Sequence, residues 1–285
     1  MRRPLATLKA GSAMAPVRER FGDFEDWLRA GLRLPASDLR LIRVAEGEPL
    51  PPPDECGGIV ITGSHAMVTD NLPWSVALAA WLPAVVRKRI PLLGICYGHQ
   101  LLAAAMGGRV DHRPCGPEIG TVAVELLPAA EHDPLFAALP ASFPVHCFHS
   151  QSVLTLPPQA VLLARNDFEP HHAFRLGACA WGVQFHPEYT RKIMAAEVAA
   201  AAEQLAAAGL NPAALQATAQ ACPAAASLLA RFAVLVRAVA WRPGRPVTTR
   251  PPAGQSRAAR RQPADPPPTA GAGSRPPFPA RARRA

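Results

Sequence analysis

The chain has 285 residues, and its formal net charge of +9 is concentrated at one end. Residues 242–285 contain ten arginines and one aspartate and therefore account for all of this charge, whereas the rest of the chain balances 20 basic against 20 acidic side chains. A globally basic protein that coats nucleic acid is excluded for this balanced body, and we do not expect nucleic acid as its partner.

The composition also argues against a membrane protein and against a disulfide-rich one. No apolar run reaches the ~20 residues that a membrane-spanning helix needs. The basic start of the chain resembles that of a signal peptide, but Lys9 interrupts the apolar stretch that should follow. The six cysteines form no Cys-x-x-Cys pair. The sequence therefore predicts reduced thiols in the cytoplasm, no membrane partner, and no metal or other cofactor.

Short apolar runs alternate with longer helical stretches along the chain. This alternation predicts an α/β fold with an open, mostly parallel sheet and helices on both faces. The expected strands are residues 5–9, 39–44, 58–62, 90–95, 121–127, 161–164, 172–176 and 181–185. The expected helices are residues 23–32, 74–89, 97–106, 191–208 and 224–239. We predict one domain over 1–193, an alanine-rich helical extension packed on it over 194–241, and a disordered tail rich in proline and arginine over 242–285.

The most informative segment is Gly94-Ile95-Cys96-Tyr97-Gly98-His99-Gln100, in which an apolar strand runs directly into a helix. Small residues on both sides of a nucleophile are typical of a sharp, strained turn between a strand and a helix. The unpaired N–H groups at the start of that helix favour a thiolate, which is the attacking form of cysteine. A buried structural cysteine is the alternative interpretation of Cys96.

A second segment, Gly182-Val183-Gln184-Phe185-His186-Pro187-Glu188, ends another apolar strand. The ends of parallel strands lie at the same edge of a sheet, so we expect His186 to reach the thiol of Cys96. Glu188, two residues further on, would then orient the imidazole ring. A histidine at a strand end is more commonly a surface residue, and only its pairing with the cysteine motif favours a catalytic base.

A third strand ends at Gly63 and Ser64, at the same predicted edge. A backbone N–H in this turn, together with the N–H of Tyr97, could stabilise the oxyanion of an acyl intermediate. This signal is weak alone, because a strand followed by Gly-Ser is usually an ordinary turn.

These segments, in this order, resemble the class I (triad) glutamine amidotransferase domain, which occurs in the glutaminase portion of GMP synthetases and in related stand-alone proteins. The resemblance covers residues 5–193 and implies a flavodoxin-like catalytic domain. It also implies that Cys96 attacks the side-chain amide of glutamine, that His186 moves the proton, and that Glu188 holds the imidazole.

The same resemblance implies a set of substrate-binding residues: Gln100, Glu118, Ser150 and Gln151. Gln100 lies one helical turn after Cys96, and Glu118 lies in a Gly-x-Glu-x-Gly segment. Two segments depart from the family pattern. Gly63-Ser64-His65 stands where the family has Gly-Gly-Pro, and Phe148 and Gln151 replace a serine and an acidic residue in the Ser-His-Gly-Asp-x-Val segment.

Three functions follow from these patterns. The first is a glutaminase that supplies ammonia to an acceptor enzyme on a separate polypeptide, such as a synthetase subunit, because no pyrophosphatase loop or other nucleotide-binding motif follows Glu188. The second is a stand-alone γ-glutamyl peptidase that uses the same thioester chemistry. The third is a non-catalytic regulatory homologue.

Overall fold

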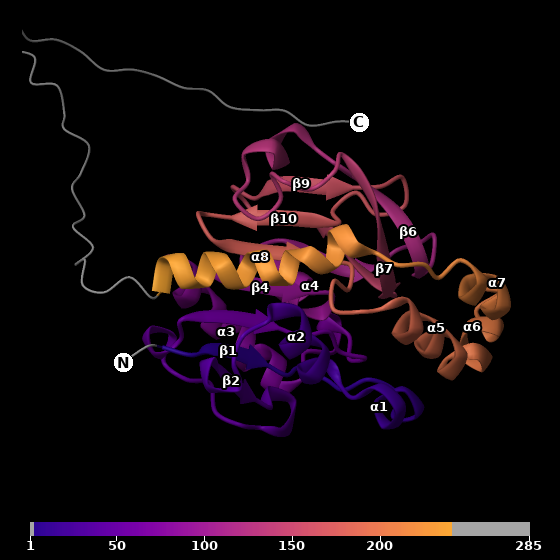
Figure 1. Ribbon diagram of the computed structural model, residues 1–285, viewed down its shortest axis with the longest axis horizontal. Coiled ribbons are helices and arrows are strands. Elements are labelled where there is room, and N and C mark those ends of the chain that lie inside the picture. The colour runs from indigo at the N-terminus through magenta and orange to yellow at the C-terminus, as the bar shows by residue number, and fades with distance from the viewer. Residues whose placement is uncertain (1–2, 241–285) are drawn as a thin grey trace, which may run out of the picture. The chain divides into compact units, whose positions relative to one another are not determined.

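The computed structural model describes residues 3–240, and these residues belong to one compact unit. The tail predicted over 242–285 lies outside the described residues. Figure 1 shows a central sheet with helices on either side of it.

The centre of the described unit is a nine-stranded mixed sheet with the strand order β2-β1-β3-β4-β11-β10-β9-β6-β7. One half is parallel and consists of β1 (Leu5–Leu8), β2 (Leu39–Ile42), β3 (Gly58–Ile61), β4 (Leu92–Ile95) and β11 (Ala180–Val183). The other half is antiparallel and consists of β10 (Ala173–Leu176), β9 (Val161–Arg165), β6 (Glu118–Leu126) and β7 (Ser142–His149). A separate two-stranded ribbon pairs β5 (Arg109–His112) with β8 (Gln151–Thr155). The predicted α/β fold is confirmed, and the structure refines the mostly parallel sheet to a mixed one.

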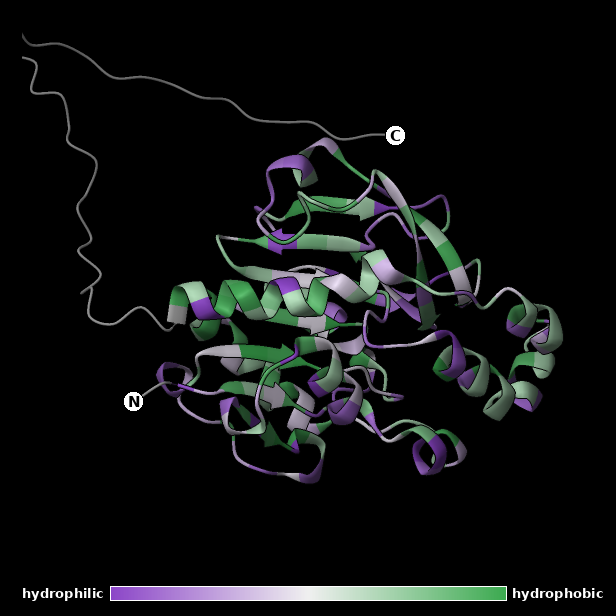
Figure 2. Ribbon diagram, viewed as in Figure 1, coloured by the Kyte–Doolittle hydropathy of each residue, from purple (hydrophilic) through white to green (hydrophobic). Residues whose placement is uncertain are grey.

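Alternating side chains of the parallel strands bury both faces of the sheet. Leu5 and Val60 face α2 (Phe24–Leu32) and α8 (Pro223–Ala240), whereas Leu8 and Ile61 face α3 (Pro73–Arg87) and α4 (Tyr97–Ala105). Much of the central strands is coloured green, as hydrophobic, in Figure 2. Burial on both faces explains why these strands read as continuous apolar runs in the sequence.

The remaining helices are α1 (Ala15–Phe21), α5 (Arg191–Ala200), α6 (Ala202–Ala207) and α7 (Pro212–Ala217). They lie together beyond the end of the sheet, as Figure 1 shows. Their buried side chains share a third hydrophobic cluster with Phe24 and Tyr189. None of the helices within residues 3–240 has the length and apolar character required to cross a membrane.

Helix α8 packs directly on the sheet. An added Cβ at Gly58 would lie 2.6 Å from a methyl group of Val236, and one at Gly31 would lie 2.3 Å from a methyl group of Leu229. The two glycines therefore let α8 approach β3 and α2 closely. The helix contributes to the same core as residues 5–193, while the domain boundary at residue 193 stays a prediction.

Candidate active site

Cys96 occupies the sharp turn between β4 and α4. Its backbone has φ 50° and ψ −99°, a conformation that residues with a side chain rarely adopt. The flanking glycines make this turn possible: an added Cβ at Gly94 would lie 2.4 Å from the carbonyl oxygen of Gly98, and one at Gly98 would lie 2.8 Å from Cβ of Ile61. The small residues of the motif are thus required by close backbone packing.

His186 and Glu188 follow β11, the parallel neighbour of β4. The N–H of Cys96 donates to the carbonyl of Val183, the last residue of β11, at 2.8 Å, which fixes the two strand ends side by side. His186 Nδ1 donates to Glu188 Oε1 at 2.8 Å, and both side chains are buried. The carboxylate therefore orients the ring so that its other nitrogen, Nε2, is free to exchange a proton with the thiol.

The imidazole of His186 and the thiol of Cys96 meet beside Gly63. An added Cβ on Gly63 would lie 3.0 Å from Cε1 of His186 and 3.8 Å from Cβ of Cys96. Burial opposes a charged ring, but the Glu188 carboxylate and a hydrogen bond with Cys96 outweigh it and raise the pKa of His186 to about 10. The structure thus brings Cys96, His186 and Glu188 together and stabilises the cationic form of the imidazole beside the sulfur.

Two aromatic rings lie close to the imidazole of His186. The Tyr189 ring stacks on it with a centroid distance of 4.2 Å and an interplanar angle of 20°, and the Phe24 ring lies at 6.3 Å and 12°. The sequence did not point to Phe24, which lies at the start of α2 and far from His186 along the chain. The stacked Tyr189 ring limits the rotation of the imidazole and favours its cationic form.

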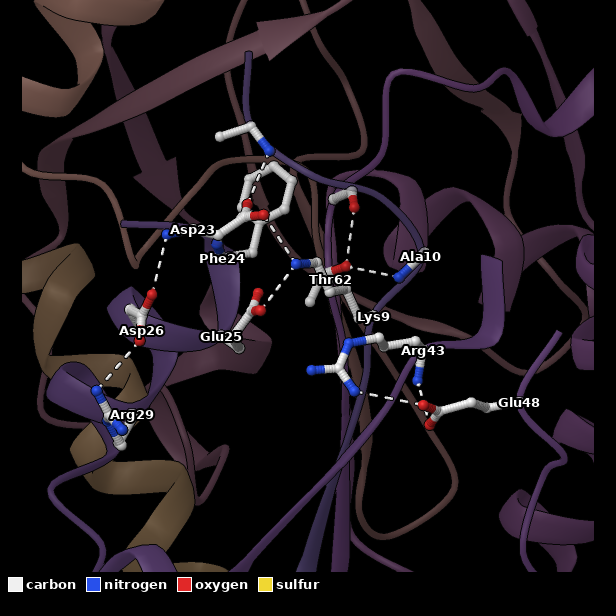
Figure 3. A network of polar contacts seen from close by, with 12 residues as sticks. Lys9, Ala10, Asp23, Phe24, Glu25, Asp26, Arg29, Arg43, Glu48 and Thr62 are labelled. Atoms are coloured by element: carbon white, nitrogen blue, oxygen red, sulfur yellow. Dashed lines mark hydrogen bonds and ion pairs between the residues drawn. The ribbon is translucent and has the colours of Figure 1, made fainter. Parts of the chain in front are cut away.

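A buried ion pair anchors the helix that carries Phe24. Lys9 Nζ lies 2.8 Å from Asp23 Oδ2 and 2.8 Å from Glu25 Oε1, as Figure 3 shows. Asp23 also caps α2 through a reciprocal capping box with Asp26. Burial opposes the ammonium, but the two carboxylates raise the pKa of Lys9, so that the anchor stays charged. The end of β1 and the start of α2 are therefore fixed to each other next to the candidate site.

The predicted oxyanion groups lie beside the thiol. Ser64 and Tyr97 line the same cavity as Cys96, and Gly63 is in contact with His186. The N–H of Tyr97 is the first of α4, where amide groups have no partner within the helix. Which of these N–H groups would bind an oxyanion stays a prediction.

A cavity of about 420 Å³ opens above Cys96. Its lining includes Gln100 on α4, Gln151 on β8 and the neighbouring Ser150. Gln100 Nε2 donates to the carbonyl of Gln151 at 2.6 Å and to Gln184 Oε1 at 3.0 Å. Three of the four predicted substrate-binding residues therefore lie in the cavity wall.

The side chain of Gln151 ties the cavity wall to the turn after β3. Its Oε1 accepts from the N–H of Val68 at 3.0 Å, and its Nε2 donates to Thr69 Oγ1 at 2.6 Å. This side chain therefore has a structural role in the turn, which distinguishes it from the acidic residue it replaces in the family pattern.

Glu118 lies behind the cavity rather than in its lining. It accepts a hydrogen bond from His149 Nε2 at 3.0 Å and lies 3.2 Å from His172 Nε2, with all three side chains buried. Burial disfavours the carboxylate, but these histidines and Asn166 outweigh it and lower the pKa of Glu118. Glu118 therefore contacts the cavity wall through His149, and its direct role in substrate binding stays a prediction.

Glu118, Cys147 and His149 form the one described group with ligand atoms close enough for a metal ion, within 4.8 Å of one another. Burial and the neighbouring Glu118 carboxylate raise the pKa of the Cys147 thiol well above its usual range. Within this group Glu118 accepts a hydrogen bond from His149 Nε2, so the carboxylate supports the ring that lines the cavity.

Cys96 in its strained turn, the buried His186–Glu188 pair and the adjacent cavity thus lie together at one edge of the α/β sheet. The family model described as "Glutamine amidotransferase class-I" matches residues 46–202. The chain belongs to the class-I glutamine amidotransferase family.

Two kinds of curated relatives are similar to the chain. A GMP synthase [glutamine-hydrolyzing] from Aeropyrum pernix is 37% identical over 155 residues, which cover 54% of this chain and 27% of the relative. Gamma-glutamyl peptidase 5 from Arabidopsis thaliana is 31% identical over 159 residues, which cover 54% of this chain and 63% of the relative. The chain thus spans about a quarter of the GMP synthase and just under two thirds of the peptidase.

Solved structures agree with the fold. A glutamine amidotransferase from Thermotoga maritima superimposes with a TM-score of 0.65 at 22% identity, covering 84% of this chain and 99% of that one. A glutamine amidotransferase from Methylobacillus flagellatus gives a TM-score of 0.62 at 26% identity, covering 84% and 94% of the two chains.

Proposed function

We propose that the protein hydrolyses a γ-glutamyl amide bond through a thioester on Cys96, with glutamine as substrate and ammonia passed to a separate acceptor enzyme in the cytoplasm. The observation that carries this proposal is the contact of Cys96 with His186, whose Nδ1 is held 2.8 Å from Glu188, at the wall of a cavity. This is the arrangement that an activated nucleophile requires.

The first half of the reaction forms the thioester. The Cys96 thiolate attacks the amide carbon of the substrate, and the oxygen becomes an oxyanion facing the N–H groups of Tyr97 and of the Gly63–Ser64 turn. As the C–N bond breaks, the imidazolium of His186 gives its Nε2 proton to the departing nitrogen, which leaves as ammonia. Glu188 stabilises the imidazolium throughout and stays ionised.

The second half restores the enzyme. A water molecule attacks the thioester carbon while the neutral imidazole of His186 accepts one of its protons. The C–S bond breaks, glutamate is released, and the thiolate–imidazolium pair forms again. The net reaction consumes glutamine and water and yields glutamate and ammonia.

The separate acceptor rests on the extent of the similarity. The GMP synthases similar to this chain match it over about a quarter of their own length. The family model, which matches residues 46–202, spans Cys96, His186 and Glu188. Ammonia released here would thus be consumed by a synthetase subunit that the described residues do not supply.

A γ-glutamyl peptidase or amidase is the second candidate, and the size of the cavity favours it. A volume of about 420 Å³ lies in the range of pockets that hold ligands well above the size of glutamine. Similarity to γ-glutamyl peptidases and to a γ-glutamyl-L-1-hydroxyisopropylamide hydrolase from Pseudomonas supports the same chemistry on a substituted amide.

The test is to incubate the purified protein with glutamine and with γ-glutamyl amides and to measure ammonia or released amine. Ammonia release that stays negligible until a synthetase is added supports the glutaminase, and cleavage without any partner supports the second candidate. Turnover that persists unchanged in Cys96→Ala refutes both. Absence of turnover of every substrate, with or without a synthetase, supports a non-catalytic regulatory homologue.

A further inference from the structure

We infer that four buried side chains behind the cavity form a binding site for a zinc ion. One of them lies on β6, two lie on β7 and one directly precedes β10: Glu118, Cys147, His149 and His172. The inference goes beyond the proposed hydrolysis, because the ion takes no part in the thioester chemistry. It departs from the sequence-based expectation of no metal, since only Cys147 and His149 are close to each other along the chain.

The pairing of β6 with β7 brings three of the ligands together. Glu118 is the register partner of His149, and Cys147 lies two residues before His149 on the same strand. The ligand atoms of these three buried residues lie within 4.8 Å of one another. Two ligands bound tetrahedrally to zinc are ~3.3–3.8 Å apart, so small side-chain rotations are enough to close the group around an ion.

His172 supplies the fourth ligand from a different part of the chain. Its side chain is fully buried, and its Nε2 lies 3.2 Å from Glu118 Oε2. Neither ring nitrogen of His172 makes a hydrogen bond within residues 3–240. A buried polar atom without a partner is costly, and a metal ion bound at Nε2 removes this cost for one of the two nitrogens.

The surroundings of His149 also require a cation between its ring and Glu118. His149 Nδ1 lies 3.0 Å from the carbonyl oxygen of Gln151, which can only accept, so Nδ1 carries a proton. Nε2 faces the Glu118 carboxylate at 3.0 Å, where either a second proton or a metal ion must lie between the two. A histidine that binds a metal through one nitrogen commonly donates the other N–H to a backbone carbonyl. Asn166 in turn holds the carboxylate, because its Nδ2 donates to Glu118 Oε1 at 2.8 Å.

The donor set fits Zn²⁺ in type and in charge. A thiolate, two imidazoles and a carboxylate are ligands that zinc binds in closed, four-coordinate sites. One thiolate and one carboxylate balance the two positive charges of the ion, so that the loaded site is neutral, as its burial requires. Binding replaces the thiol proton of Cys147 and the Nε2 proton of His149, which leave to solvent. The raised pKa of the free Cys147 thiol does not prevent this exchange, because a coordinated thiol is deprotonated by the metal.

The ion joins β6, β7 and the start of β10 behind the cavity. His149 is both a ligand and part of the cavity wall, so the ion holds this wall in place from behind. An ion that binds the folded chain and not the unfolded one also raises the stability of the fold.

The test is a titration of the full chain with Co²⁺, a spectroscopic substitute for zinc. Cys96→Ala serves as the background, so that the thiol next to His186 cannot bind the ion. We expect stoichiometric Co²⁺ to produce the thiolate-to-metal absorption in the near ultraviolet, and we expect Zn²⁺ to remove it by displacing Co²⁺. Absence of this absorption overturns the site.

Variants of the ligands show where the ion binds. In the same background, Cys147→Ser should remove the absorption, and His172→Gln should lower the affinity for Co²⁺ at least about tenfold. Cys56→Ser removes another buried free thiol, outside the cluster, and serves as the matched control that should keep both. An absorption that persists in Cys147→Ser, or that disappears equally in Cys56→Ser, contradicts the site.

Thermal melting gives a second measurement, which does not depend on the cobalt spectrum. Zn²⁺ should raise the Tm of the Cys96→Ala chain and a chelator should lower it, whereas neither should change the Tm of the chain that also carries Cys147→Ser. Far-UV circular dichroism checks that each variant is folded. A Tm that Zn²⁺ leaves unchanged in the Cys96→Ala chain, or raises equally in Cys147→Ser, overturns the site. Neither measurement uses a substrate, so its failure is distinguishable from failure of the proposed hydrolysis.

Discussion

The hydrogen bond between His186 and Glu188 allows one prediction to be worked through in numbers. The Nδ1–Oε1 distance is 2.8 Å and both side chains are buried. With the two charge centres about 4 Å apart and an effective dielectric constant of about 20, their attraction is about 4 kcal/mol. This energy corresponds to about three pH units in the titration of the imidazole.

Glu188→Gln keeps the shape and an oxygen acceptor but removes the negative charge. The pKa of His186, raised to about 10 in the folded protein, should then fall to about 7. Because the thiolate needs a protonated partner to deliver a proton to the leaving nitrogen, activity is lost as pH rises through this pKa. The alkaline limb of the pH profile should therefore move to lower pH.

The assay is kcat/KM for the best substrate between pH 6 and 10. In Glu188→Gln the ratio of activity at pH 9 to activity at pH 6.5 should fall about a hundredfold, on top of an overall loss of about 10³-fold or more. Glu125→Gln makes the same change in an exposed ion pair with Arg165 and should leave the profile unmoved. An alkaline limb in Glu188→Gln that stays at the wild-type pH refutes the electrostatic role of the carboxylate.

Three further variants test other parts of the site. Cys96→Ala should abolish thioester formation and turnover without changing the far-UV circular dichroism, while Cys115→Ala, an exposed cysteine, should keep both; turnover in Cys96→Ala would exclude it as the nucleophile. Gly94→Ala places a methyl group 2.4 Å from the backbone oxygen of Gly98 and should lower the free energy of unfolding by about 1–3 kcal/mol in urea titration; unaltered stability would contradict this packing. Phe24→Leu removes one ring near the imidazole of His186 and should lower kcat severalfold with little change in KM, whereas a change in KM alone would indicate a role in substrate binding.

The sequence predicted those parts of the site that local rules determine. Glycines around Cys96 and an apolar run before His186 are enough to place both residues at the ends of buried parallel strands, and β4 and β11 are indeed neighbours. Contacts between residues that are far apart along the chain could not be predicted, because they leave no signal in the local sequence. Phe24 beside His186 and Glu118 beside His149 are brought together only by tertiary packing.

Several elements were missed for the same reason. Strand β7 contains Pro144, and β5 is short and mostly exposed, so neither reads as a buried strand without its partner. Strand β8 pairs with β5 outside the main sheet, and α1 and α7 are short helices that follow prolines or contain them. Their stability comes from neighbours that lie far away along the chain, and intrinsic propensity is a weak guide in such cases.

Under the proposed function, the backbone conformation of Cys96 lowers the stability of the fold while it positions the nucleophile. A conformation at φ 50° and ψ −99° costs a residue with a side chain about 1–3 kcal/mol and costs glycine much less. Cys96→Gly is therefore expected to melt at a higher temperature than the native chain while losing all turnover. Selection for a higher melting temperature cannot use this substitution, because the glycine that relieves the backbone strain also removes the sulfur that the proposed reaction needs.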